Sequence, residues 1–367
     1  MMTASISAAA ANDRHRLEAT ELSWRWTALA LLSVRFIQGF IYWGGGSRRF
    51  IYAPAKLNPD SAHWMANKFQ SAMPGALLGT DKIIAFLLHH FSALYPALIA
   101  FSGLELLCGL GLIFGLFTRL SALGTIFFSI ALMLMFGWQG ATCIDEWTMA
   151  ASNLAMGASL ILLGGGAYSL DNLLLRHWPA LEGQTWFRWI CGSLPLPLSI
   201  RAFPATALAI LAFTVVFNVA TYSYYRGSVI TPFHSGPVSP SKHHYTLTNS
   251  SLQADGGVTF HAYLDGGTPA VASHLVQASI TDATGHVIAV WDMAALSALP
   301  KAAIHNDFTY NQVKTGPYGL VAEVGAMATI TLPARGPVTA NAPLNLNLTN
   351  VSGKVFHARL QSAAAPA

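Results

Sequence analysis

The sequence predicts a membrane-spanning α-helical bundle followed by a C-terminal all-β sandwich domain. Of its 367 residues, 53% are hydrophobic and only 10% are charged, whereas soluble domains carry about 25% charged residues. Long apolar runs fill the first two-thirds of the chain, and the part after Gly227 is polar and rich in Thr, Ser, Asn and Gly. The net charge of +4 is scattered, which excludes a nucleic-acid-binding protein.

The helical part is expected to cross the membrane five times, because a spanning helix needs about 20 mostly apolar residues. Residues 1–23 lack the apolar core of a cleavable signal peptide and are expected to form a cytoplasmic tail. Residues 24–175 should form a four-helix bundle, 176–203 a cytoplasmic interfacial loop and 204–225 one further transmembrane helix. The apolar runs are 24–43, 94–117, 120–140, 147–164 and 204–222, of which 147–164 is near the short limit.

The distribution of Lys and Arg predicts the orientation. Cations precede the first run, occupy the turn between the second and third, and lie between the fourth and fifth, so these three segments are expected to be cytoplasmic. The domain at 226–367 would then be extracytoplasmic, on a multi-pass protein of the cytoplasmic (inner) membrane. The loop at 44–91 breaks the rule, since it must lie outside yet carries five Lys and Arg residues. Either loops of this length translocate regardless of charge, or this loop gathers cations for an anionic substrate.

The polar C-terminal segment alternates strand-like runs such as "GVTFHAYLDGG" with turn signals, which is typical of an antiparallel sandwich. None of the five apolar runs contains a histidine, and the three cysteines are too few for an iron–sulfur cluster. No c-type haem motif or nucleotide-binding glycine motif occurs. The sequence therefore shows no haem, flavin, iron–sulfur cluster or metal site, and a redox reaction would use a diffusible electron carrier.

A charged pair is predicted inside the membrane. Arg35 lies in the first apolar run and Glu105 in the second, and the two helices should run antiparallel. Counted from outer ends at Trp43 and Leu94, the two residues lie roughly 12 and 16 Å deep at helical rise. Burying both charges costs roughly 6 kcal/mol and their contact returns about 4 kcal/mol, so hydrogen bonds or a wet cavity are also expected. The pair either holds the helices together or lines a functional pathway, and the second interpretation is favoured.

Polar residues around this pair predict a pocket that opens outward. Gln38 and Tyr42 share a helix face with Arg35, and Ser102 lies one turn from Glu105. Further polar groups close the third run and lie in the outer half of the fourth, and cations stand at the predicted mouth beside the acidic loop "CIDEW". The floor of the pocket would be the Arg35–Glu105 pair.

Two parts of the chain resemble known families. "VRFIQGFIYWGGGSRRF" and "GLELLCGLGLIFGLFTRLSALG" resemble the DoxD/DoxX membrane family, with an Arg in the first helix, a Glu in the second and a G-x-F-T-R-x-x-A turn. "SGPVSPSKHHYTLTNSSL" and "NDFTYNQVKTGPYGLVAEVGAMATITLP" resemble DoxA, the small subunit of thiosulfate:quinone oxidoreductase. The combination implies an enzyme that oxidises two thiosulfate ions to tetrathionate on the outer membrane face and passes electrons to membrane quinone.

This resemblance suggests roles for the residues picked out above. The predicted catalytic residues, which pair charges, relay protons or form a thiolate, are Arg35, Glu105, Cys143, Asp145 and Glu146. The predicted substrate-binding residues for the thiosulfate dianion are Arg48, Arg49, Lys56, Gln38, Gln139 and Asn153. The predicted quinone-binding residues are Tyr42, Trp43, Trp138 and Trp147, which alternatively form an interfacial belt. Cys143 is either a nucleophile or an ordinary loop cysteine, because two neighbouring carboxylates disfavour its thiolate.

Two other functions remain open on the sequence alone. The chain could be a non-catalytic DoxX-like scaffold, or a quinone-binding protein, that recruits a partner through its β domain. It could also be an oxidoreductase that uses sulfite or sulfide as its donor. The expected partners are thiosulfate, membrane quinone and the lipid bilayer, and the two-subunit arrangement of the family is compatible with a homodimer of fused chains.

Overall fold

The computed structural model describes residues 2–52, 54–139, 146–226, 236–336 and 343–362. The chain divides into two compact units that do not follow its linear order. We call Met1–Leu57, Pro96–Ala131 and Thr148–Ala220 the helical unit. We call Asn58–Tyr95, Leu132–Trp147 and Thr221–Ala367 the β-containing unit.

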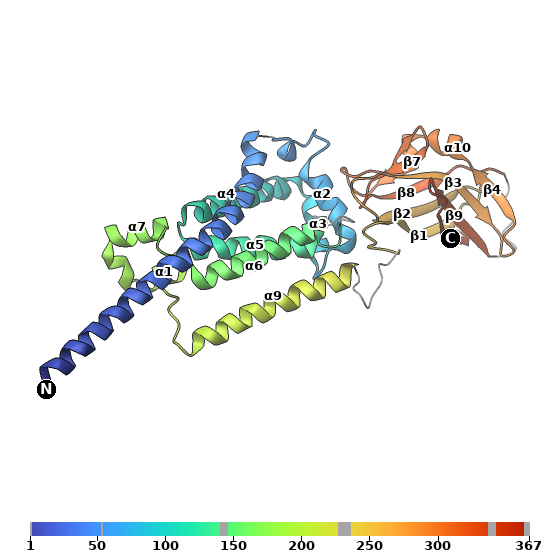
Figure 1. The fold of residues 1–367 in the computed structure, drawn as a ribbon. Helices are drawn as coiled ribbons and strands as arrows, with labels where there is room; N and C mark the ends of the chain where they lie inside the picture. Colours follow the sequence, from blue (N-terminus) through green and yellow to red (C-terminus); the bar gives the residue numbers. More distant parts are fainter. Residues whose placement is uncertain (1, 53, 140–145, 227–235, 337–342, 363–367) are drawn as a thin grey trace. The chain divides into compact units, whose positions relative to one another are not determined.

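Long helices make up the helical unit (Figure 1). The first, α1, runs from Met2 to Ser47 and continues into one turn of π-helix, η1. Short helices follow the bundle helix α6 and lead toward α9 (Figure 1). The elements that lie wholly or partly in this unit are α1 (Met2–Ser47), η1 (Arg48–Tyr52), η2 (Pro54–Leu57), α4 (Phe91–Phe114), α5 (Thr118–Phe136), α6 (Glu146–Leu163), α7 (Leu170–His177), η4 (Pro179–Gly183), α8 (Thr185–Ile190) and α9 (Ala202–Arg226).

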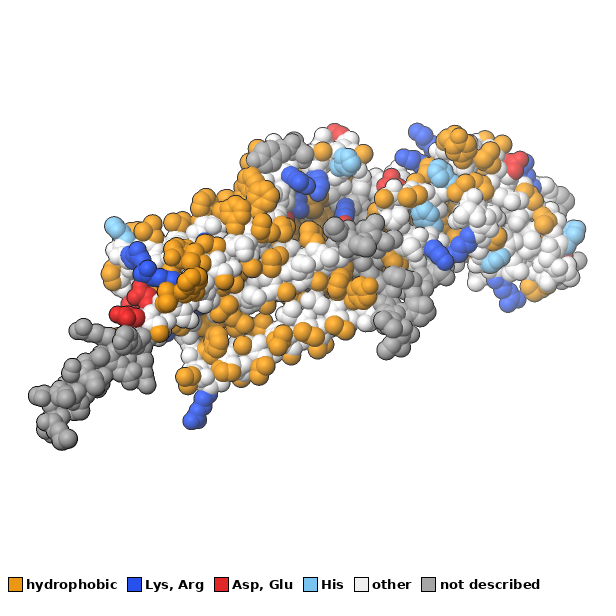
Figure 2. All heavy atoms as spheres, in the orientation of Figure 1, with side chains coloured by type: hydrophobic (Ala, Val, Ile, Leu, Met, Phe, Trp, Pro, Cys, Tyr) orange, Lys and Arg blue, Asp and Glu red, His pale blue; other side chains and the backbone are white. Residues whose placement is uncertain are grey.

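Four helical segments among the described residues are long and apolar enough to cross a membrane. They are Leu17–Ile51, Phe91–Phe114, Thr118–Phe136 and Ala202–Tyr225. Figure 2 shows hydrophobic side chains over the visible faces of α1 and α9, as expected of helices that meet lipid. The predicted helix at 147–164 forms as α6, but its 18 residues do not reach the same apolarity, so its role as a fifth span stays a prediction.

The predicted end of the first helix at Trp43 is wrong, since α1 continues through Gly44, Gly45 and Gly46 to Ser47. A run of glycines usually ends a helix, but here the missing side chains let α4 approach. A Cβ added at Gly109 of α4 would lie 2.3 Å from the backbone nitrogen of Trp43, and one added at Gly39 would lie 2.8 Å from the carbonyl oxygen of Gly109. The backbones of α1 and α4 are therefore in direct contact, as small residues permit in membrane helices.

This contact generates a stability prediction. Gly109→Ala forces the backbones of α1 and α4 apart, and overpacking of this kind costs about 1–3 kcal/mol. We expect the melting temperature of the purified, detergent-solubilised protein to fall by several degrees. The matched control is Gly103→Ala on the same helix, where an added Cβ has nothing within 4 Å and helix propensity alone predicts a neutral or slightly stabilising change. Equal melting temperatures for the two variants would contradict the contact.

A buried carboxylate ties the turn between α4 and α5 to the short helices. Asp171 of α7 is fully buried and accepts hydrogen bonds from the backbone N–H groups of Phe117 (2.7 Å), Thr118 (3.0 Å) and Gly192 (2.7 Å). In the same region Arg119 donates to the carbonyl oxygens of Ile161 (2.9 Å), Arg188 (3.1 Å) and Cys191 (2.7 Å). The G-x-F-T-R turn is thus held by side chain to backbone bonds.

Asp171→Ala should destabilise the protein severely, because it leaves these three N–H groups buried without an acceptor, at about 1–3 kcal/mol each. We expect loss of the folded protein or a large fall in its melting temperature. Asn172→Ala is the neighbouring control, since it removes one described hydrogen bond, 2.8 Å from Nδ2 to the carbonyl oxygen of Ala167. A milder effect at Asp171 than at Asn172 would show that Asp171 does not hold the turn.

The β-containing unit combines loop helices with a nearly closed sheet. Its loop helices are α2 (Met65–Ala72), η3 (Met73–Gly75) and α3 (Thr80–His89). The strands are β1 (His244–Leu252), β2 (Val258–Gly266), β3 (Ser273–Thr281), β4 (Val287–Trp291), β5 (Ile304–Asn306), β6 (Lys314–Gly316), β7 (Gly319–Ala322), β8 (Met327–Leu332), β9 (Leu344–Asn350) and β10 (Val355–Ser362), with α10 (Met293–Ser297) and η5 (Lys301–Ala303) between them.

The ten described strands form one continuous, nearly closed sheet. The order is β5-β8-β2-β1-β10-β9-β3-β7-β6, with β4 paired to β3. The pairs are antiparallel except β1 with β10, which run parallel through Ser251 and Gln361 and through Leu252 and Ser362. Alternating residues of these strands fill one core around Phe260, Trp291 and Ile330, between facing parts of the sheet. The predicted all-β sandwich is confirmed.

The loop helix α2 docks on this β structure through one buried amide. Gln70 is fully buried, and its Nε2 donates to the carbonyl oxygens of Asn311 (2.8 Å) and Gly325 (3.0 Å), while its Oε1 accepts from the N–H of Asn311 (2.9 Å). Gly325 has φ +87°, and a Cβ there would lie 2.1 Å from the carbonyl oxygen of Gln70. Part of the loop between the first two apolar helices therefore folds with the β strands.

Candidate anion site

The charged cluster of the helical unit forms where α1 passes into η1. Arg49 lies in that π-helical turn, and turns of this kind occur often at functional sites. Its Nη1 donates to Ser102 Oγ at 3.3 Å and forms an ion pair with Glu105 Oε2 of α4. The predicted pairing of Glu105 with Arg35 is wrong. The glycines extend α1 beyond its predicted end, so Arg49 rather than Arg35 reaches the level of Glu105.

The cluster is nearly buried but open to solvent. The side chains of Arg49 and Glu105 are each 12% exposed, and Ser102 is fully buried. A Cβ added at Gly45 would lie 2.2 Å from Glu105 Oε1, so the carboxylate rests against the backbone of α1. Lys56 in η2 adds a second positive charge that acts on Glu105, whereas Arg48 is exposed.

Arg35 lies elsewhere in the unit, 14 residues or roughly 21 Å of helix before Arg49. It is 5% exposed, and it donates from Nη1 to the carbonyl oxygen of Gly165 (3.0 Å) and from Nη2 to that of Tyr168 (2.8 Å). These bonds tie α1 to the turn after α6, close to the glycine at position 115. The catalytic role of Arg35 stays a prediction, and its observed partners are backbone carbonyls.

A polar layer crosses α1, α5 and α6. Gln38 Nε2 donates to Thr125 Oγ1 (3.2 Å) and to the carbonyl oxygen of Asn153 (2.8 Å). The hydroxyl of Tyr42 donates to the carbonyl oxygen of Thr125 (3.0 Å) and lies 3.0 Å from Ser129 Oγ. Gln38 and Asn153, which were both predicted to line the pocket, are thus in contact. The amide N–H groups of Gln38 already donate to protein acceptors. Thr125 and Ser129 were missed, although "TIFFS" places both on the third apolar run.

The other predicted site residues lie in different surroundings. Trp43 stays in the helical unit, with its ring centroid 5.6 Å from that of Phe40. In the β-containing unit, Trp138 donates to the carbonyl oxygen of Ala72 (2.9 Å), Gln139 to that of Ser71 (2.6 Å), and Trp147 to Thr221 Oγ1 (3.0 Å), while Glu146 pairs with Lys68. Cys143 and Asp145 lie outside the described residues.

The thiols and carboxylates form no group suited to a metal ion within the described ranges. Cys108 and Cys191 are free cysteines, and Cys108 follows Glu105 by three residues on α4. Burial raises the pKa of the Cys191 thiol, which favours its neutral form. The surroundings of Cys191 therefore do not activate it as a nucleophile.

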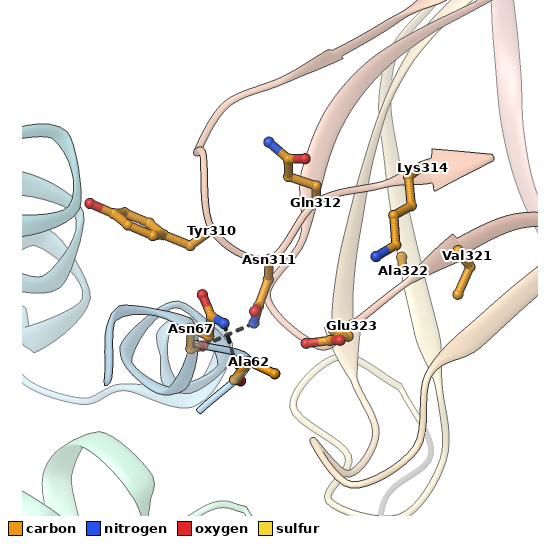
Figure 3. Close-up of a pocket in the computed structure, with 9 residues that line it drawn as sticks. All are labelled: Ala62, Asn67, Tyr310, Asn311, Gln312, Lys314, Val321, Ala322 and Glu323. Atoms are coloured by element: carbon orange, nitrogen blue, oxygen red, sulfur yellow. Dashed lines mark hydrogen bonds between the residues drawn. The ribbon is translucent and has the colours of Figure 1, made fainter. Parts of the chain in front are cut away.

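A small polar cavity lies beside the Gln70 contact in the β-containing unit (Figure 3). Its volume is about 290 Å³, and its charged lining groups are Lys314 and Glu323. Figure 3 shows Asn67 and Asn311 joined by a hydrogen bond at its lower edge, 2.9 Å from Asn311 Nδ2 to the carbonyl oxygen of Asn67. Because one cation faces one carboxylate, the cavity offers no net charge to a dianion.

The fold and the cluster define a class: a multi-helix membrane protein with a near-buried Arg–Glu pair between its first two apolar helices and a β-sandwich domain after its last. Residues 30–199 match the family described as "TQO small subunit DoxD", and residues 225–359 match "TQO small subunit DoxA". The chain therefore belongs to the DoxD and DoxA families, joined in one polypeptide. Both families are subunits of thiosulfate:quinone oxidoreductase, and membership in them makes this chain an oxidoreductase.

One solved structure, "Structure of Iho670 Flagellar-like Filament", is aligned with 45% of this chain and 100% of its own. The TM-score is 0.21 and the sequence identity 8%. That likeness is too low to support any argument about this fold.

Proposed function

We propose that the chain is a thiosulfate:quinone oxidoreductase that oxidises two thiosulfate ions to tetrathionate and passes two electrons to a membrane quinone. The observation that carries this proposal is the presence of both the DoxD and the DoxA family in one chain. The Arg49 cluster supplies a matching chemical feature, a guanidinium close to the surface of an apolar bundle.

The substrate explains why a cation is needed. Joining two thiosulfate dianions through their terminal sulfurs brings like charges together, at a cost of several kcal/mol without nearby positive groups. Arg49 offers a planar guanidinium suited to oxyanions, Ser102 offers a hydroxyl beside it, and Lys56 adds positive charge. We assign the thiosulfate site to this cluster, with Arg48 as an exposed cation that attracts anions toward it.

Electron and proton flow then balance. Forming the new sulfur–sulfur bond releases two electrons, and reduction of the quinone consumes those two electrons and two protons. Glu105, Asp145 and Glu146 are the proposed proton carriers. For the quinone ring we propose Tyr42 and Trp43, which belong to the same helical unit as Arg49, and Trp138 and Trp147 stay further predicted aromatic residues. We further propose that the reaction occurs on the outer face of the cytoplasmic membrane, with the β domain extracytoplasmic.

The direct test is an assay on the purified full chain. It should reduce a water-soluble quinone analogue when thiosulfate is added, and tetrathionate should accumulate at one molecule per quinone reduced. Activity with sulfite or sulfide but not with thiosulfate would show that the electron donor is a different sulfur anion. Absence of quinone reduction with every sulfur anion would instead favour the scaffold function.

A second experiment distinguishes the roles of the two neighbouring arginines by their effects on the KM for thiosulfate. Arg49→Ala removes the guanidinium that contacts Ser102 and Glu105, so we expect the KM for thiosulfate to rise at least tenfold, since a charge-assisted hydrogen bond is worth about 1.5–3 kcal/mol. Arg48→Ala should raise KM only a few-fold, and that effect should vanish at high ionic strength, because an exposed charge acts by screened attraction. Equal effects of the two substitutions on KM would show that Arg49 does not bind thiosulfate directly.

A further inference from the structure

We propose that Glu105 is an internal competitor for the anion site: an entering thiosulfate dianion replaces its carboxylate on Arg49, and Glu105 takes up a proton from water as it is displaced. This inference rests on thiosulfate being the substrate. It adds to the proposed function a coupling between substrate binding and proton loading.

The first support is that the cation of the site is already neutralised. The ion pair with Glu105 and the contact with Ser102 both involve Nη1 of Arg49. A dianion that arrived beside the intact pair would meet the negative charge of Glu105 at the same guanidinium. Because Arg49 and Glu105 are each only 12% exposed, solvent screens that repulsion weakly. The anion can therefore bind well only if the carboxylate moves away or loses its charge.

The second support is an unused donor on the same guanidinium. Arg49 Nε is buried and has no hydrogen-bond partner within the described part of the chain. An unsatisfied buried N–H costs about 1–3 kcal/mol. A carboxylate held at Nη1 leaves this donor empty, whereas an anion with several oxygen and sulfur acceptors can engage Nε and an Nη together. The geometry thus suits a larger anion than the one that holds it at rest.

The third support is that the carboxylate lies where it can be displaced. Glu105 Oε1 occupies the space that a side chain at position 45 would fill. The carboxylate is the end of a flexible side chain, and within the described residues it accepts a hydrogen bond from Arg49. Once Arg49 binds another anion, the remaining described attraction on the carboxylate is the positive charge of Lys56, which acts without a described hydrogen bond to it.

Among the titratable groups around the site, Glu105 is the one that we expect to change protonation when the anion binds. They are Tyr42 on α1, Cys108 on α4, Arg49 on η1 and Lys56 on η2. Tyr and Cys are ordinarily neutral near pH 7, and Arg and Lys ordinarily charged. Displacing Glu105 from Arg49 removes the contact that favours its charged form, and a bound dianion beside it favours the protonated form further. The proton taken up in this step is one of the two that quinone reduction consumes.

Calorimetric titration of the full chain in nanodiscs with sodium thiosulfate tests this coupling. Repeating the titration near pH 7 in two buffers of different ionisation enthalpy gives the number of protons taken up per anion bound. We expect about one proton for the wild-type protein. Glu105→Gln should take up none and should bind thiosulfate about tenfold more tightly, since it no longer offers a competing charge.

A second variant leaves the titratable group in place. Gly45→Ala puts a Cβ where Glu105 Oε1 lies and so pushes the carboxylate from Arg49; we expect tighter thiosulfate binding with reduced proton uptake on binding. The control is Lys82→Ala, an exposed cation on α3, which should behave as wild type. Melting temperatures of all variants show whether each is folded.

The outcomes separate the two proposals. Thiosulfate binding and turnover in the wild-type protein without proton uptake, or weaker binding by both Glu105→Gln and Gly45→Ala, would overturn the competitor role and leave the proposed function standing. Failure of the wild-type protein to bind thiosulfate would overturn both. Tighter binding without proton uptake in Glu105→Gln, beside uptake in wild type, supports the coupling.

Discussion

The backbone contact between α1 and α4 determines where the charges of the helical unit meet. Gly39, Gly46 and Gly109 let the two helices approach until backbone atoms touch. That contact sets the register, so Glu105 lies beside Gly45 and Arg49 rather than beside Arg35. The same register carries Arg35 to the opposite end of the contact, where backbone carbonyls after α6 receive it. The helix interface therefore decides which arginine lies beside Glu105.

Much of the fold could be predicted because burial in lipid and folding in water each produce a simple pattern of apolar and polar residues in the sequence. Apolar runs of about 20 residues predicted the long helices, and short runs between turns predicted the strands. The helix boundaries were less predictable: the first apolar run was ended at Trp43, although α1 continues to Ser47 and Gly46 packs closely against Leu106 of α4. The strand order could not be predicted, since the parallel pairing of β1 with β10 joins opposite ends of the domain.

The candidate site was predictable in its residue types but not in its pairing. The sequence pointed to an Arg–Glu contact between the first two apolar helices, and the structure contains one with Arg49 in place of Arg35. Counting depth from assumed helix ends could not decide between the two arginines, because each residue of helix shifts the level by about 1.5 Å. Gly45 gave no chemical signal of its own. The docking of Gln70 against Asn311 was also unforeseeable, because the two residues are 241 positions apart in the chain.

The Gln70 contact has a consequence for how the two families are joined. Gln70 falls in the segment that matches DoxD, and Asn311 and Gly325 fall in the segment that matches DoxA. Between separate chains, such a contact would have to offset the loss of translational and rotational freedom on association. Within one polypeptide the contact is intramolecular, and the covalent connection raises the effective concentration of the two partners. The hydrogen bonds of the buried Gln70 amide therefore need only fix how α2 lies against the β strands, and they do not have to supply the free energy of association between two chains.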